Sequence, residues 1–260
     1  MDSWLPSLTL SELIAAVVAF HLGMTVVCTS SGFLIEKLLR DRRVWDVPLA
    51  PGQYRFELAG NVRYLSVQIL AFVGVLYAGL IQFDTSGEAS AVATFAVAYF
   101  GFQVYYYFLH RLLHRRPWIR FHRWHHRSRV TTPLTGQSMS AVEAVGWAIG
   151  YLLVPALASL VMPLSALGWV LYIAYNVNGN IIGHSNVEFH NPLSRVRLFS
   201  FFLPPVIYHA LHHARWTGHY GFASTGLDGL LGTEFDDWKA VSRRVAGGEP
   251  LTDLKQRVPS

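Results

Sequence analysis

The chain has 260 residues, of which 52% are hydrophobic and only 14% are charged, and its formal net charge is +5. Charged residues make up about a quarter of a typical soluble domain, so this composition favours a protein embedded in lipid. The single cysteine, Cys28, excludes an intrachain disulfide, a thiolate zinc site and a CxxCH haem attachment. The arginines lie beside apolar segments rather than in a basic tail, which argues against nucleic-acid binding.

Five apolar segments approach the length of about 20 residues that a helix needs to cross a bilayer. The first, Leu13–Ile35, follows acidic residues and precedes the basic sequence EKLLRDRR. This charge order is opposite to that of a cleavable signal peptide, so we expect a retained span with an outside N-terminus. The other four segments are Leu65–Phe83, Ala89–Leu109, Ala141–Val161 and Leu164–Gly183. The last two can form one hairpin, and we expect an all-α integral membrane protein with about four to five transmembrane helices.

The arginines predict which way these spans face. Seven of them follow the third span between Arg111 and Arg129, and the positive-inside rule makes that face cytoplasmic. A count of crossings places the acidic link Asp84–Glu88 on the other side. The segment Phe201–His209 is too short and too proline-rich to span, so we expect it to approach the interface. The polar chain from Phe222 onward is expected to form a cytoplasmic cap.

Histidines are concentrated in HRLLHRRPWIRFHRWHH, residues 110–126, and in HALHHARWTGH, residues 209–219. The first two are four residues apart, which places both rings on one face of a helix. Two triplets share the spacing H-x2-H-H, and each is expected to direct two or three ring nitrogens toward one point. Neutral imidazole is the commonest protein ligand of metals, and eight rings exceed the four ligands of a structural zinc. We therefore expect two metal ions in a shared cage of His110, His114, His122, His125, His126, His209, His212 and His213.

The remaining histidines are judged by their position in the chain. His184, in GHSNVEF, lies where the fifth span returns to the same face and is expected to complete the cage. His190 joins only if the backbone bends near Pro192. His219 is either a loop ligand or an outer hydrogen-bond partner. His21 lies within the first span without companion ligands and is expected to be unrelated.

At these residues the chain resembles the fatty acid hydroxylase and sterol desaturase superfamily. The elements YYYFLHRLLH, HRWHH, GHSN and HALHH occur in that family's order, and HYGFASTGLDGLLGT resembles its tail. The resemblance runs from Phe102 to about Trp238. The chain departs from the family pattern at Gln103, Leu227 and His219. These departures concern the outer hydrogen-bond partners and the subfamily, and not the metal cage. The resemblance implies a dimetal centre without further catalytic side chains, ligated by His110, His114, His122, His125, His126, His184, His209, His212 and His213.

The same resemblance implies an enzyme that uses O2 and two electrons to hydroxylate or desaturate a sterol, fatty acyl or related lipid. Its cofactors are two iron ions, which zinc can replace in purified protein. The electrons come from an external cytochrome b5-like, ferredoxin-like or reductase partner, because the sequence has no Gly-rich dinucleotide fingerprint. We expect a multi-pass protein with a cytoplasmic metal site, in a bacterial inner membrane rather than the endoplasmic reticulum. Its expected parts are transmembrane helices and linkers in residues 1–88, a histidine-box hydroxylase/desaturase domain in 89–240 and a polar tail in 241–260.

Outer partners and competing functions also follow from the residues. A ligating imidazole needs its other ring nitrogen fixed by a partner, and the candidates are Glu143, Glu188, Asp228 and Asn186. A zinc-dependent hydrolase would require a metal-bound water and a glutamate base, as in HExxH, and this motif is missing from the sequence. A metal transporter would place ionisable residues near the middle of the bilayer, whereas these lie at span ends. A haem-binding subunit needs one histidine from each of two facing helices, whereas this sequence has histidine triplets.

The arginine asymmetry makes a testable prediction about topology. Reporter tags at the C-terminus and near Arg127 should be cytoplasmic, and a tag near Ser86 should lie on the opposite side of the membrane. Accessibility to a membrane-impermeant reagent measures this directly. A tag near Ser86 that reports the cytoplasm would contradict the number of crossings.

Overall fold

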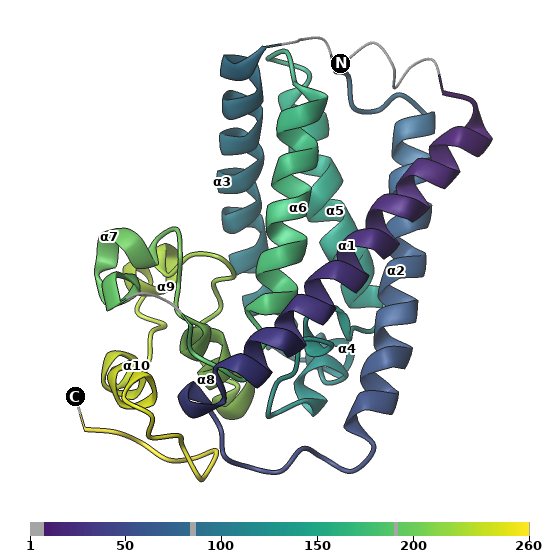
Figure 1. Ribbon diagram of the computed structural model, residues 1–260. Helices are drawn as coiled ribbons and strands as arrows, with labels where there is room; N and C mark the ends of the chain where they lie inside the picture. Colours follow the sequence, from purple (N-terminus) through teal and green to yellow (C-terminus); the bar gives the residue numbers. More distant parts are fainter. Residues whose placement is uncertain (1–7, 84–86, 190–191, 260) are drawn as a thin grey trace.

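The computed structural model describes residues 8–83, 87–189 and 192–259, and all regular secondary structure within them is helical (Figure 1). Extended contacts in these residues are isolated bridges, such as the one between Trp45 and Leu251. Short 3-10 turns include η3 (His125–Arg127) and η4 (Thr135–Gln137). The α-helices are α1 (Leu10–Leu38), α2 (Gln53–Tyr77), α3 (Glu88–Leu113), α4 (Ile119–His122), α5 (Ala141–Ala158), α6 (Ala166–Ile182), α7 (Arg197–Ser200), α8 (Val206–Arg215), α9 (Gly226–Leu230) and α10 (Trp238–Ala246).

In the described part of the chain, four helices are long and apolar enough to cross a membrane, namely α1, α2, α3 and α5. The shorter α6 packs between them against α1 and α3. Large apolar side chains point outward along the bundle, for example Leu70 at 74% and Leu160 at 75% exposure. An apolar exterior of this kind matches a lipid solvent rather than water. The predicted fold class, an all-helical membrane protein, is confirmed.

The predicted start of the second span is wrong. Helix α2 begins at Gln53 rather than Leu65, and it ends at Tyr77 before Phe83. Its early turns carry three buried polar residues, Gln53, Glu57 and Asn61. They share one face of the helix because they are four residues apart. These polar residues lower the hydropathy of a segment that is nonetheless helical. The predicted link Asp84–Glu88 lies largely outside the described residues.

The bundle is closely packed around aromatic side chains. Helix α5 packs against α2 and α3, and the rings of Phe102 and Tyr151 stack with their centroids 4.9 Å apart. Where α6 begins, a Cβ on Gly168 would lie 2.2 Å from the carbonyl oxygen of Ala91. A side chain at this position would not fit, so glycine lets the backbones of α3 and α6 touch.

The histidine-rich segments gather at one end of the bundle, where α3 and α6 end and α5 begins. Figure 1 shows α4 and α8 at this end, with α10 and the C-terminus close by. Helix α8 packs against α10, and Val44, Trp45, Val241 and Leu251 close a second apolar core there. The three-part division of the chain remains a prediction, and α10 runs across its boundary at residue 240.

Candidate metal centre

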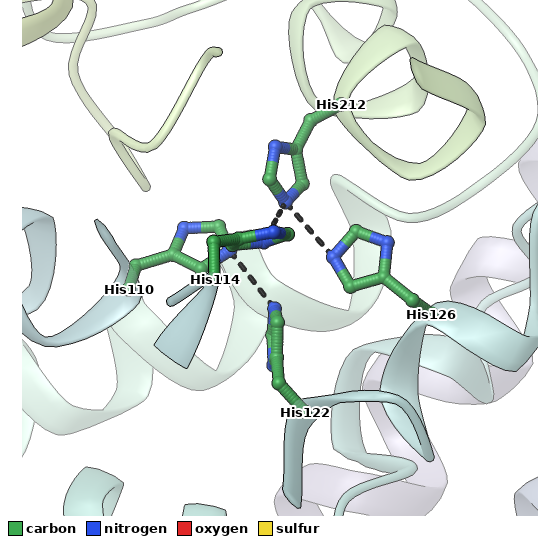
Figure 2. A group of neighbouring side chains, drawn as sticks. All are labelled: His110, His114, His122, His126 and His212. Carbon is green, nitrogen blue, oxygen red and sulfur yellow. Dashed lines mark hydrogen bonds between the residues drawn. The ribbon is translucent and has the colours of Figure 1, made fainter. Parts of the chain in front are cut away.

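Five histidines converge where α3 ends, and we call them group one. Each offers a ring nitrogen, and these five atoms all lie within 4.8 Å of one another. Figure 2 shows the rings pointing toward a common centre from three separate parts of the chain. The members of group one are His110 and His114 at the end of α3, His122 at the end of α4, His126 in η3, and His212 on α8.

Four further histidines form group two beside the first. Their ligand atoms also lie within 4.8 Å of one another, and all four residues are buried. The two groups adjoin, because the stacked rings of His126 and His213 have centroids 4.7 Å apart. The structure therefore brings together all nine histidines of the predicted cage. The members of group two are His125 in η3, His184 just after α6, and His209 and His213 on α8.

Two of the three rings in each triplet point into one group, within the predicted two or three, and the third ring belongs to the other group. His209 and His213 are four residues apart and share a face of α8, whereas His212 lies on the neighbouring face. The other triplet is divided because α4 ends at His122, and His125 begins the separate turn η3. Each triplet therefore contributes to both groups, and neither group is built from one local sequence element.

Hydrogen bonds fix the orientation of most of the rings. A carbonyl oxygen can only accept, so a ring nitrogen that contacts it must donate its proton. A neutral ring that donates from Nδ1 then presents a lone pair at Nε2. In group one, His110 donates to Tyr220 O at 2.9 Å, His212 to Gly218 O at 2.7 Å, and His122 contacts Glu143 Oε1 at 2.8 Å. In group two, His125 donates to Ser138 O, His184 to Asn180 O and His213 to Ser128 O.

These bonds leave Nε2 atoms facing one another across each group. The Nε2–Nε2 distance is 3.1 Å between His110 and His122, 3.0 Å between His126 and His212, and 3.2 Å between His209 and His213. Facing lone pairs repel unless a proton or another cation lies near both of them. Since several buried Nε2 atoms face inward in each group, both groups fit a metal ion that prefers nitrogen ligands.

Burial opposes protonation of the same rings. It lowers the pKa of His122 and His213 well below the usual histidine range, and it lowers the pKa of His212 to about 4. The neighbouring histidines lower the pKa of each ring further, because a second positive charge nearby is unfavourable. The rings are therefore neutral near pH 7, which is the form that binds metals.

The four candidate outer partners have different roles. Glu143 contacts a histidine directly, through Nδ1 of His122. Asp228 accepts the main-chain amides of Tyr220 and Gly221, each at 2.7 Å, and so holds the loop whose carbonyl binds His110. Glu188 and Asn186 act further away. Glu188 accepts the amide of Ile207 at the start of α8, and Asn186 pairs with the main chain of Trp45 at 2.9 Å.

His219 and His21 lie outside both groups. His219 donates from Nδ1 to Tyr208 O at 2.7 Å, and its Nε2 accepts the amide of Phe235 at 2.9 Å. Both nitrogens are thus occupied, so His219 supports the loop rather than serving as a ligand. His21 donates to Val17 O within α1, apart from the two groups as expected. His190 lies outside the described residues.

The sequence reasoning missed the polar face of α2. Gln53 donates to Val130 O, and Asn61 donates to Leu134 O, each at 2.7 Å. Between them, Glu57 binds hydroxyl groups of the same loop. The repeated spacing of four residues was a visible signal, but its meaning depended on the distant loop that the face contacts.

The fold and the site define a helical membrane protein with two adjoining histidine groups that can hold metal ions. The family model described as "Fatty acid hydroxylase" matches residues 95–233, which is more than half of the chain. The chain belongs to this family, as the histidine elements predicted.

Curated relatives are plant proteins. "Very-long-chain aldehyde decarbonylase CER1" of Arabidopsis thaliana is 32% identical over 161 residues, covering 57% of this chain and 24% of that protein. "Very-long-chain aldehyde decarbonylase GL1-4" of Oryza sativa subsp. japonica is 33% identical over 193 residues, covering 68% of this chain and 30% of that protein. The chain thus spans under a third of the length of these relatives. No solved structure matches the chain.

The geometry ranks the histidines for a substitution test. His212→Ala removes the ring whose Nε2 lies near both His114 and His126, so group one should bind metal much more weakly than in the wild type. His21→Ala and His219→Ala should bind as much metal as the wild type, because neither ring belongs to a group. Elemental analysis of the purified variants measures this. A fully metallated, active His212→Ala protein would contradict the assignment of group one.

Proposed function

We propose that the protein is a membrane-bound di-iron oxygenase that hydroxylates or desaturates a lipid with O2 and two electrons. The observation that carries this proposal is the pair of adjoining groups of buried histidines whose nitrogens face inward. His110, His114, His122, His126 and His212 would hold one ion, and His125, His184, His209 and His213 the other. When bound, two iron ions supply the O2 activation that cleavage of a lipid C–H bond requires.

Iron is the proposed metal, although zinc can occupy the same nitrogen ligands. Imidazole binds iron, zinc and copper, so the donor set alone does not select among them. Membership of the fatty acid hydroxylase family supports iron. The protein's own contribution is to hold the rings neutral and fixed, through the carbonyl oxygens that accept their Nδ1 protons.

An apolar cavity supports a lipid substrate and indicates where it binds. A cavity of about 270 Å³ lies beside group two, and its lining includes His184 and His209. Its other walls are mainly apolar, with Ile35 from α1, Leu203 before α8 and Phe222 after it. A hydrocarbon chain in this cavity would lie against the second group, and the apolar walls would exclude water from the reacting carbon.

A different opening reaches group one. His114 is the one member of the nine that is not fully buried, and it lines a recess together with Arg111 and Arg115. An external electron donor with an acidic surface could approach from this side, since opposite charges favour encounter. The proposed arrangement places this basic end in the cytoplasm. The two openings share no lining residue, so the electron donor and the lipid would approach the centre separately.

A second candidate reaction comes from the relatives. The printed names of the similar plant proteins describe decarbonylases of very-long-chain aldehydes, so an aldehyde of a long chain is an alternative substrate here. The same apolar cavity and histidine groups would serve either reaction. A zinc-dependent hydrolase is less well supported. Such an enzyme requires a free carboxylate as its general base, whereas Glu143 is engaged with the His122 ring.

Lipid analysis tests the proposed function. Membranes that contain the wild-type protein, with O2 and an electron donor, should form an oxidised lipid or alkene that His213→Ala membranes lack. Mass spectrometry of the extracts detects the product, and a hydrocarbon one carbon shorter than an added aldehyde would favour decarbonylation instead. Identical lipid profiles from both membranes, with iron bound to the wild type, would contradict the oxygenase proposal.

The cavity makes a separate prediction about substrate size. Gly179 lines the cavity, and a Cβ added there would meet no atom within 4 Å. Gly179→Leu should therefore fill space that a lipid chain occupies. We expect KM for long substrates to rise about tenfold, which corresponds to about 1.4 kcal/mol of lost binding free energy. Both metal ions should stay bound. Gly74→Leu is the control, because its Cβ also meets open space but it does not line this cavity. Equal KM values for the two variants would argue against this cavity as the substrate site.

A further inference from the structure

A buried carboxylate on α2 lies outside every histidine-rich segment. Glu57 is 0% exposed, and its two oxygens accept four hydrogen bonds. Oε1 accepts from Ser128 Oγ at 2.6 Å, Thr135 Oγ1 at 2.7 Å and Gln53 Nε2 at 2.9 Å. Oε2 accepts from Thr132 Oγ1 at 2.7 Å. Four donors approach the number of lone-pair positions of a carboxylate, so Glu57 is the centre of a satisfied network.

Ser128 joins this network to group two. Its hydroxyl donates to Glu57, and its main-chain carbonyl accepts the Nδ1 proton of His213 at 2.9 Å. That hydrogen bond directs Nε2 of the same ring toward His209, 3.2 Å away. The position of Ser128 therefore sets the direction of the His213 ring, and Glu57 helps to hold Ser128 in place.

A second route leads from Glu57 to His125. Thr135 donates its hydroxyl to Glu57 and accepts the amide of Ser138 at 2.9 Å with its carbonyl. The carbonyl of Ser138 in turn accepts the Nδ1 proton of His125 at 3.3 Å. Both routes end on members of group two. Group one has a carboxylate of its own, because Glu143 contacts His122 directly.

The helix and the loop are matched in shape as well as in polarity. A Cβ on Gly60 would lie 2.7 Å from Cα of Ser138 and 2.5 Å from its Oγ. The backbone of α2 therefore touches the end of the loop that runs from Ser128 to Ser138. Gln53 and Asn61 bind carbonyl oxygens of the same loop on either side of Glu57. Helix α2 thus serves as the template on which this loop is ordered.

From this network we infer that Glu57 is a positioning residue for group two. It anchors Ser128 and Thr135, and through them it fixes the rings of His213 and His125. The inference rests on the proposed function, in which group two holds one of two metal ions. Loss of an outer partner typically weakens metal affinity by about 10–100-fold, and we expect that change at one of the two ions only.

Titration of metal-free, full-length protein with Co²⁺ tests this role without any turnover. Calorimetry and the visible absorption of bound Co²⁺ count the ions and give an affinity for each. The wild type should bind two. Ser128→Ala and Thr135→Ala, which remove the two hydroxyls on the routes from Glu57 to His213 and His125, should each weaken one site by about 10–100-fold and leave the other unchanged. Ser128→Ala keeps the carbonyl that His213 uses, so its effect reports the lost contact with Glu57.

Thr131→Ala is the matched control. Thr131 lies in the same loop and is buried, but its hydroxyl has no hydrogen-bond partner among the described residues. This variant should therefore bind both ions as the wild type does. Glu57→Gln keeps one oxygen for the three donors at Oε1, so it should lose less affinity than Glu57→Ala.

Three results would overturn the inference. Equal affinities for Ser128→Ala, Thr135→Ala and Thr131→Ala would show that the hydroxyl contacts do not position the ligands. Parallel weakening of both sites, with a lower Tm of the metal-free protein, would show that the network only stabilises the fold. A wild-type protein that binds fewer than two Co²⁺ ions would refute the two-metal function itself and remove the basis of the positioning role.

Discussion

The mutual approach of nine neutral imidazoles is the constraint on which the rest of the structure depends. Their facing Nε2 atoms lie as close as 3.0 Å, at a position where burial lowers the pKa of rings such as His213 well below its usual range. Two lone pairs at this distance repel unless a proton or a metal ion lies between them, since a low-dielectric interior strengthens the repulsion. The surrounding fold must therefore hold the rings in place, and Nδ1 hydrogen bonds to main-chain carbonyls do so for His110, His125, His184, His212 and His213.

Residues other than the histidines supply much of this support. Asp228 holds the loop that presents the Tyr220 carbonyl to His110. Glu188 accepts an amide at the start of α8, and α10 packs behind the same helix. On the other side, the polar face of α2 orders the loop that leads from η3 to α5. Asp228, Glu188 and Glu57 are the buried carboxylates of these three contacts. Each accepts hydrogen bonds from main-chain amides or side-chain donors, which offset the cost of burying a polar group.

The two groups have different surroundings, and this asymmetry matters for the proposed chemistry. An apolar cavity lies against His184 and His209, whereas a recess lined by Arg111 and Arg115 reaches His114. In the proposed reaction a hydrocarbon chain and an electron donor need opposite environments, one dry and one charged. Separate approaches would allow both without exposing the reacting carbon to water. Membership of the fatty acid hydroxylase family and the similarity to plant aldehyde decarbonylases support a lipid substrate for this proposed reaction.

The sequence by itself determined the class of the fold, the family and the set of histidines that meet. Hydropathy reveals long apolar helices, and spacings of three and four residues reveal which rings share a face of a helix. Tertiary structure alone decided that His125 separates from His122 and His126, that His219 supports a loop, and that α2 begins at a buried polar face. Local spacing describes one element at a time. The partner of each face is set by packing between segments far apart in the chain, as between Glu57 and Ser128.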